Sequence, residues 1–228
     1  MSLDAFILAR SGSKGIKDKN LLKLGNRSLL EISIEFAVNC QQIDRVFLST
    51  DSISYETLGV NAGATSLGIR PSQLAGDLSK TADVLIDAVG KMRELKPKTI
   101  LLLQPTSPFR ESTDVDKLLR HKKKFDADAA VSLYEIDDPH PNKMKVISPQ
   151  NLRVHPFLPG TTSESPRQLL PKVYGLTGAY YLIDVHALMQ YKTLFPPNTV
   201  GYVMDKKVNI DNLDDYKYAQ YLWDKEGS

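Results

Sequence analysis

Near its amino end the chain reads Ala5-Phe6-Ile7-Leu8-Ala9-Arg10-Ser11-Gly12-Ser13-Lys14-Gly15-Ile16-Lys17-Asp18-Lys19-Asn20. The apolar residues 5–9 predict a buried strand, and a loop of small residues with several cations follows directly. Small residues let backbone N–H groups approach an anion closely, and nearby cations offset its charge. The loop is therefore typical of a triphosphate site, although an ordinary strand–loop connection with solvated lysines explains it equally well.

Two common nucleotide motifs are absent from this loop. It contains neither Gly-x-x-x-x-Gly-Lys-Ser/Thr nor Gly-x-Gly-x-x-Gly. The second absence disfavours an oxidoreductase built on a dinucleotide-binding fold. Together the two absences favour nucleotide-binding α/β folds that bind phosphates through side chains.

Length and composition predict one globular domain over residues 1–228. Apolar residues make up 42% and charged residues 25%, a balance that argues against disorder. The formal net charge of +2 favours neither a nucleic-acid partner nor a membrane surface. No run approaches the roughly 18 apolar residues of a membrane helix, and no signal peptide is evident. The single cysteine, Cys40, is expected in the core of a cytoplasmic protein.

Apolar runs that alternate with helical patterns predict a parallel sheet with crossover helices. Ser28 and Glu31 form a capping-box pattern at the first helix, while Asp51 and Thr113 are expected to cap two later helices. Strands are expected at 4–9, 45–50, 65–67, 99–104, 128–136, 173–183 and 199–204. Helices are expected from 28, from 53, over 80–96, over 114–124, after 183 and over 213–225.

Residues 137–171 interrupt this alternation. They show little helical periodicity and contain prolines at positions 139, 141, 149, 156, 159 and 166. A segment of this length is too long for a simple connection. We expect an extended β-ribbon or arm here, with a disordered flap as the alternative.

Four further motifs follow the amino-terminal loop in a fixed order. They are Leu103-Gln104-Pro105-Thr106-Ser107-Pro108-Phe109-Arg110, Pro166-Arg167-Gln168-Leu169-Leu170-Pro171, Thr177-Gly178-Ala179-Tyr180-Tyr181 and Asn209-Ile210-Asp211. In order and spacing the whole set resembles the acylneuraminate cytidylyltransferases, also called CMP-sialic acid synthetases. No single motif is unique to that family, but the ordered set is specific, and it covers nearly the whole chain.

The resemblance implies a Rossmann-like nucleotidyltransferase fold, an α/β architecture with a mostly parallel sheet flanked by helices. It implies transfer of CMP from CTP to the anomeric hydroxyl of an acidic keto-sugar of the nonulosonic class, with release of pyrophosphate. Mg²⁺ is the implied cofactor. The resemblance also implies a homodimer in which the arm at 137–171 reaches the partner's active site.

The resemblance further implies which residues bind the nucleotide. Arg10, Lys14 and Lys19 would hold the β- and γ-phosphates and act in catalysis. Arg70 would read cytosine, because its paired donors suit the O2 and N3 acceptors of that base. Thr81 would complete the base pocket or, alternatively, cap the helix that follows. The full nucleotide-binding set is Arg10, Ser11, Gly12, Lys14, Lys19, Asn20, Arg70, Ser79 and Thr81.

A second set of residues is expected to bind the sugar. Gln104 ends the central strand at the carboxyl edge of the sheet, where ligands bind in open α/β folds. Arg167 suits a carboxylate, because its planar fork gives two parallel hydrogen bonds. Lys143 and Arg167 are expected to serve a neighbouring subunit. The full set is Gln104, Lys143, Arg167, Gln168, Tyr181 and Phe195, with core packing as the alternative for Phe195.

Asp211 is the expected catalytic metal ligand, because Mg²⁺ takes one or two carboxylates together with phosphate oxygens. Asn209 stands where the family usually has aspartate, and it is expected to coordinate through its carbonyl oxygen without adding charge. This departure leaves a catalytically weakened nucleotide-binding or regulatory homologue as an alternative. Residues 175–177 read Gly-Leu-Thr where sialic acid enzymes commonly carry Arg-Pro-Asn. A legionaminic-type acid or 3-deoxy-octulosonate is therefore an alternative substrate.

Overall fold

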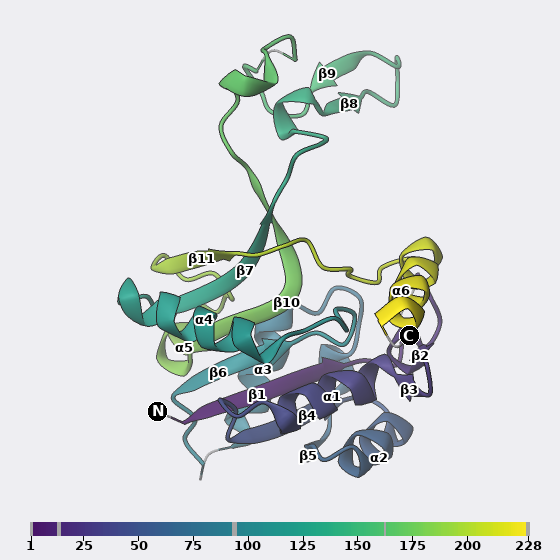
Figure 1. The fold of residues 1–228 in the computed structure, drawn as a ribbon, viewed down its shortest axis with the longest axis vertical. Helices are drawn as coiled ribbons and strands as arrows, with labels where there is room; N and C mark the ends of the chain where they lie inside the picture. The colour runs from purple at the N-terminus through teal and green to yellow at the C-terminus, as the bar shows by residue number, and fades with distance from the viewer. Residues whose placement is uncertain (1, 13–14, 93–94, 162, 227–228) are drawn as a thin grey trace.

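The amino-terminal strand lies in the middle of a seven-stranded sheet with the order β11-β7-β10-β6-β1-β4-β5 (Figure 1). This computed structural model describes residues 2–12, 15–92, 95–161 and 163–226. The strands of the sheet are β1 (Leu3–Ala9), β4 (Arg45–Thr50), β5 (Thr65–Ile69), β6 (Thr99–Leu103), β7 (Ala129–Glu135), β10 (Tyr174–Asp184) and β11 (Thr199–Val203).

Most neighbouring strands are parallel, as the alternation of strands and helices predicts. β1 pairs in parallel with β4 and β6, and β7 pairs in parallel with β11. The exception is β10, which runs antiparallel to both β6 and β7. Among the described residues between β7 and β10 there is no crossover helix. The chain goes out along β7 and returns along β10, and such a return gives antiparallel pairing. The expected mostly parallel sheet flanked by helices is confirmed.

The core has two layers because residues of β1 alternate between the two faces of the sheet. Ala5 and Ile7 pack with α1 (Leu29–Asn39), α2 (Ile53–Asn61) and α4 (Ser112–Lys124). Phe6 packs on the opposite face with α3 (Thr81–Gly90) and α5 (Val185–Tyr191).

The last helix, α6 (Leu213–Glu226), lies beside elements from the start of the chain. Its Ala219 packs with Leu29 of α1 and with Leu24 of a short hairpin formed by β2 (Lys23–Leu24) and β3 (Arg27–Ser28). Figure 1 places α6 next to this hairpin. The packing brings residues just before α6 close to the loop that follows β1.

The capping expectations have mixed outcomes. The capping box is confirmed, because Ser28 Oγ accepts from the Glu31 N–H and the Glu31 carboxylate accepts from the Ser28 N–H. The Asp51 cap is wrong, since Ser52 caps α2 and Asp51 contacts Ser11 instead. The Thr113 cap is also wrong, because α4 already begins at Ser112.

The helix expected over 80–96 is shorter than predicted, because α3 ends at Gly90. Glycine is a weak helix former, and the chain turns after it. Met92 donates its N–H to the Val89 carbonyl in that turn and is still buried. Met92 therefore packs into the core beside the apolar residues of α3, although a turn rather than the helix carries it.

Residues 137–161 and 163–171 project from the sheet where β7 and β10 leave it (Figure 1). The projection carries the antiparallel hairpin of β8 (Lys145–Ile147) and β9 (Val154–Pro156) and the short helices η3 (Pro141–Lys143) and η4 (Arg167–Leu169). Large apolar side chains are exposed on it, namely Val146, Ile147, Leu152, Val154, Phe157, Leu158 and Leu169. The expected role of this arm in a dimer stays a prediction.

Cys40 lies at the end of α1 and is only 2% exposed. Burial raises the pKa of its thiol, which further limits formation of the reactive thiolate. We expect the native protein at pH 8 to react with a thiol reagent at least about tenfold more slowly than the unfolded chain. The absorbance of a released chromophoric thiol measures this, and equal rates in the two states would contradict the burial.

Among the described residues, no helix is both long and apolar enough to span a bilayer.

Candidate active site

Two adjoining cavities open at the carboxyl ends of the parallel strands β1 and β6. The smaller has a volume of about 250 Å³ and the larger about 330 Å³. Leu8, Arg10 and Gln104 line both. The smaller cavity also has Arg70, Leu74, Gly76, Asp77, Ser79, Thr81, Val84 and Leu102 in its wall. The larger also has Gly15, Lys19, Asn20, Pro105, Thr106, Asn209 and Asp211.

The loop after β1 is held by polar contacts at both ends. The Ser11 N–H and hydroxyl donate to the two carboxylate oxygens of Asp51, over 2.8 and 3.1 Å. The buried Asn20 donates from Nδ2 to the Arg10 carbonyl over 2.9 Å. Asp51 thus positions the loop, a role that the sequence did not reveal because aspartate before a helix is equally typical of a cap.

Arg10 lines both cavities and pairs there with an acidic side chain. Its Nη1 lies 2.8 Å from Asp77 Oδ1, with the two side chains 31% and 32% exposed. Asp77 belongs to the loop before α3 and was not among the expected site residues. Lys14, expected beside Arg10, lies outside the described residues.

Arg70 forms part of the buried wall of the smaller cavity and is 5% exposed. Its Nε and Nη2 donate to Ser49 Oγ and the Ser49 carbonyl, over 3.2 and 2.6 Å. Burial lowers the pKa of the guanidinium, which the negative charge of Asp51 opposes. Ser79 and Thr81 share this cavity. Thr81 is not the cap of α3, because Lys80 occupies that position.

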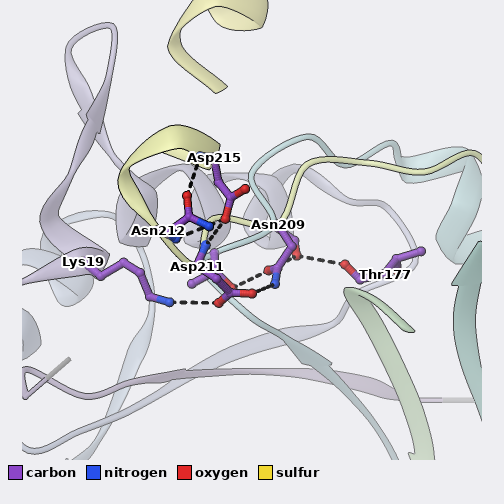
Figure 2. Close-up of polar contacts among 8 residues, drawn as sticks. Lys19, Thr177, Asn209, Asp211, Asn212 and Asp215 are labelled. Atoms are coloured by element: carbon purple, nitrogen blue, oxygen red, sulfur yellow. Dashed lines mark hydrogen bonds and ion pairs between the residues drawn. The ribbon is translucent and has the colours of Figure 1, made fainter. Parts of the chain in front are cut away.

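Asp211 lies in the larger cavity together with Lys19, although 192 positions separate the two residues in sequence. Lys19 Nζ lies 3.1 Å from Asp211 Oδ1, and Asn209 Nδ2 donates to Asp211 Oδ2 over 2.8 Å. Figure 2 shows the three side chains converging. Gly15 also approaches closely, since a Cβ there would lie 3.0 Å from the Asp211 carbonyl oxygen.

A reciprocal cap fixes the backbone around Asp211. The Asp215 carboxylate accepts from the N–H groups of Asp211 and Asn212, over 2.9 and 3.1 Å. Asn212 Oδ1 in turn accepts from the N–H groups of Asp214 and Asp215. Figure 2 shows Asn212 beside Asp215. This arrangement is a capping box in which asparagine and aspartate replace the usual pair. The spacing of Asn212 and Asp215 was the signal that could have revealed it.

Asn209 is held from the side opposite Asp211. Its Oδ1 accepts from the hydroxyls of Thr106 and Ser107, over 2.8 and 3.1 Å. The neighbouring Gly178 has φ +76°, and a Cβ there would lie 3.2 Å from Asn209 Oδ1 and 3.0 Å from Ser107 Oγ. Glycine suits position 178 for two reasons: it adopts the positive φ without strain, and it has no Cβ to clash with Asn209 and Ser107.

Arg110 holds the turn that follows β6 through hydrogen bonds to backbone carbonyls. It donates to the carbonyls of Gln104 and Ala179 and to Ser33 Oγ. Burial lowers the pKa of Arg110 to about 10, so the guanidinium stays charged at pH 7. Arg110 belongs to one of the motifs that carried the resemblance, but no pattern in that motif indicates that its side chain binds backbone carbonyls rather than a ligand.

Most of the expected sugar-binding residues lie away from the cavities within this one chain. Gln104 lines both of them. Lys143, Arg167 and Gln168 belong to the arm, where Arg167 pairs with Asp137 at 2.9 Å. Tyr181 is buried in β10 and packs edge-on against Phe195, with ring centroids 6.2 Å apart. Of the expected loop residues, Ser11 turns to Asp51 and Gly12 is exposed.

A sequence profile described as "Cytidylyltransferase" matches residues 5–221. The chain belongs to the cytidylyltransferase family. An N-acylneuraminate cytidylyltransferase of Streptococcus agalactiae serotype V is 29% identical over 214 residues, covering 92% of this chain and 50% of that protein. A CMP-N,N'-diacetyllegionaminic acid synthase of Legionella pneumophila is 26% identical over 232 residues, covering 97% of this chain and 96% of that protein. The expected kinship with acylneuraminate cytidylyltransferases is confirmed.

The fold of this cytidylyltransferase family member is also found among solved structures. CMP:2-keto-3-deoxy-manno-octonic acid synthetase complexed with CTP superimposes with a TM-score of 0.75 and 16% identity, covering 99% of this chain and 100% of that one. At this identity the likeness concerns the fold alone. The chain spans about half the length of the Streptococcus agalactiae relative.

The donor set around Asp211 fits a magnesium ion that arrives with phosphate groups. Mg²⁺ commonly uses one or two protein carboxylates and takes its remaining ligands from phosphates and water. Within the described part of the chain, no three His, Cys, Asp or Glu side chains gather as a metal cluster. Among its described lining residues the larger cavity thus offers one carboxylate, that of Asp211, which suits a nucleotide-borne Mg²⁺ better than a metal caged by protein alone.

Proposed function

We propose that this chain transfers CMP from CTP to the anomeric hydroxyl of a nonulosonic acid and releases pyrophosphate. The observation that carries the proposal is the pair of adjoining cavities that share Arg10 and Gln104. The smaller, with the buried donors of Arg70, suits a pyrimidine. The larger, with Lys19 and Asp211, suits a triphosphate and its metal. The reactive α-phosphate would then lie where the two cavities meet, beside Gln104.

The cations of the loop would drive the reaction through charge. The anomeric oxygen bonds to the α-phosphorus while the bond from that phosphorus to the bridging oxygen breaks, and the hydroxyl proton passes to solvent. Negative charge then grows on the departing pyrophosphate, which Arg10 and Lys19 would stabilise. Asp211 would hold Mg²⁺, which polarises the phosphate when bound.

Arg70 would select cytosine by its donors. Its hydrogen bonds to Ser49 fix the plane of the guanidinium, which leaves it little freedom to adapt to a different base. Ser79 and Thr81 line the same cavity and would add contacts to the base edge. Gln104 would meet the incoming acid at the shared wall.

A homodimer would complete the sugar site. Lys143 and Arg167 are exposed on the arm and lie away from both cavities of their own chain. The arm also exposes apolar side chains such as Val146 and Val154, which a partner could cover. A cytoplasmic location would keep Cys40 reduced.

Mixing two inactive variants tests this exchange of residues. We expect Arg10→Met and Arg167→Ala each to lose most turnover, because each removes a cation from the same composite site. If the arm acts in trans, a refolded equimolar mixture should regain about one quarter of the original activity. Half of the dimers are then mixed, and one of their two sites carries no change. Recovery no greater than the sum of the two variants would contradict the exchange.

Turnover with a panel of acids tests the proposed activity itself. The protein is mixed with CTP, Mg²⁺ and one of N-acetylneuraminic, a legionaminic-type or 3-deoxy-octulosonic acid, and pyrophosphate release is followed. We expect release that depends on one of the nine-carbon acids. Tight CTP binding without release for any acid would instead favour the regulatory homologue.

A further inference from the structure

The side-chain amide of Asn209 has a defined orientation in the cavity. An ionised carboxylate only accepts hydrogen bonds, so the amide nitrogen rather than the oxygen must face Asp211. The Nδ2 to Oδ2 distance of 2.8 Å fits a charge-assisted hydrogen bond. Asn209 therefore presents a donor, not a ligand oxygen, to the carboxylate expected to hold the metal (Figure 2).

The other end of the amide is occupied as well. Asn209 Oδ1 receives hydrogens from Thr106 Oγ1 and Ser107 Oγ. Turning the amide over would place its N–H₂ against these hydroxyls. Ser107 could redirect its hydrogen to the Thr177 carbonyl at 3.4 Å. For the Thr106 hydroxyl, however, Asn209 Oδ1 is the acceptor recorded within the described residues. The turned amide could still donate to the Thr106 hydroxyl, which also accepts, but it would set Asn209 Oδ1 against an oxygen of Asp211 that can only accept.

We propose that Asn209 is a positioning residue for Asp211 and not a metal ligand. This inference rests on the proposed function, and it replaces the expectation that Asn209 coordinates through its carbonyl oxygen. Thr106 and Ser107 hold the amide, and the amide holds one oxygen of Asp211. Lys19 holds the other oxygen at 3.1 Å. The carboxylate is thus oriented from both sides before the nucleotide arrives.

A metal site with one protein ligand has a measurable signature. Asp211 alone provides little affinity, so Mn²⁺ should bind much more tightly when CTP is present to supply phosphate oxygens. Removal of the Asn209 amide should disturb the orientation of the Asp211 carboxylate without removing a metal ligand. Metal affinity and turnover should then respond differently to changes at 209 and 211.

Mn²⁺ binding in the presence of CTP distinguishes a metal ligand from a residue that only positions the ligand. Free Mn²⁺ is counted by electron paramagnetic resonance for the unchanged protein, Asp211→Asn, Asn209→Leu and Asn209→Ala. We expect both changes at 209 to weaken Mn²⁺ binding by about tenfold, the lower end of what the loss of an outer-shell partner costs. Asp211→Asn should weaken it at least about tenfold more, because it removes the ligand itself and not its partner. A loss at 209 as large as that of Asp211→Asn, in a variant that folds as judged by circular dichroism, overturns the proposal.

The hydroxyl of Thr106 provides a matched pair of variants. Thr106→Val removes the donor to Asn209 with little change of shape, whereas Thr106→Ser keeps it. With the acid that is turned over, we expect kcat of the valine variant to fall about fivefold below that of the serine variant, the effect of one hydrogen bond. Their Mn²⁺ affinities should agree. Equal kcat values, or a difference in Mn²⁺ affinity, would count against the positioning role.

The experiments keep the inference apart from the proposed function. If Asp211→Asn leaves Mn²⁺ binding unchanged, the assignment of Asp211 as metal ligand fails, and the inference fails with it. If Asp211→Asn weakens binding and the changes at 209 weaken it equally, the proposed site stands and only the positioning role of Asn209 is overturned.

Discussion

Asp211→Asn should lower turnover by about a thousandfold, because a bound metal ion supplies several kcal/mol of charge stabilisation. Asp211 is the carboxylate that the larger cavity offers among its lining residues. An amide at this position keeps the shape of the side chain but loses the charge. It would also face the N–H₂ of Asn209 and the ammonium of Lys19, which were both donors to Asp211. Initial rates of pyrophosphate release with CTP and Mg²⁺ measure the effect.

Asp214→Asn is the matched control for this experiment. Asp214 is an exposed carboxylate three positions along, in the first turn of α6, and it pairs with Lys217 at 3.3 Å rather than lining the cavity. An exposed pair of this kind contributes about 1 kcal/mol or less to stability. We expect its loss to change turnover less than about twofold. Equal losses for the two variants would mean that only the charge of this region matters, and a Asp211→Asn variant as active as the original would remove Asp211 from the reaction.

Arg10→Met should lower kcat/KM for CTP by about a hundredfold, comparable to removing one donor that stabilises charge in a transition state. Arg10 lines both cavities, so its guanidinium lies where it can stabilise the negative charge that grows on the departing pyrophosphate. Methionine retains much of the apolar stem and removes the charge. The measurement is the dependence of initial rate on CTP concentration at saturating acid.

Asp77→Asn tests whether Arg10 acts directly or through its ion pair. Asp77 lies 2.8 Å from Arg10, and both side chains are about one-third exposed, so the pair adds little to the free energy of unfolding. If Arg10 contacts phosphate, releasing it from Asp77 should leave turnover within a few-fold of the original. Should Asp77→Asn lose as much kcat/KM as Arg10→Met, the ion pair and not a phosphate contact would explain the importance of Arg10.

Local features of the fold were accessible from the sequence. The strand at residues 3–9 and the helix capped by Ser28 and Glu31 follow from patterns only a few residues long. The antiparallel direction of β10 was not accessible, because direction depends on how the chain returns from the arm. The failed cap at Asp51 also depends on distant residues. A side chain that can cap a helix can equally bind a distant group, as Asp51 binds Ser11, and tertiary packing decides between them.

The family, the loop of small residues and cations, and the candidate groups expected to bind phosphate and metal could be inferred from the order of residues alone. The folded structure was needed to establish which of these candidate groups meet. Lys19 reaches Asp211 because α6 packs against the hairpin that follows the loop, and Asn209 turns its nitrogen to Asp211 because Thr106 and Ser107 occupy its oxygen. Such contacts join residues far apart in the chain. No short pattern encodes them, because they depend on the order of the strands and on the packing of whole elements.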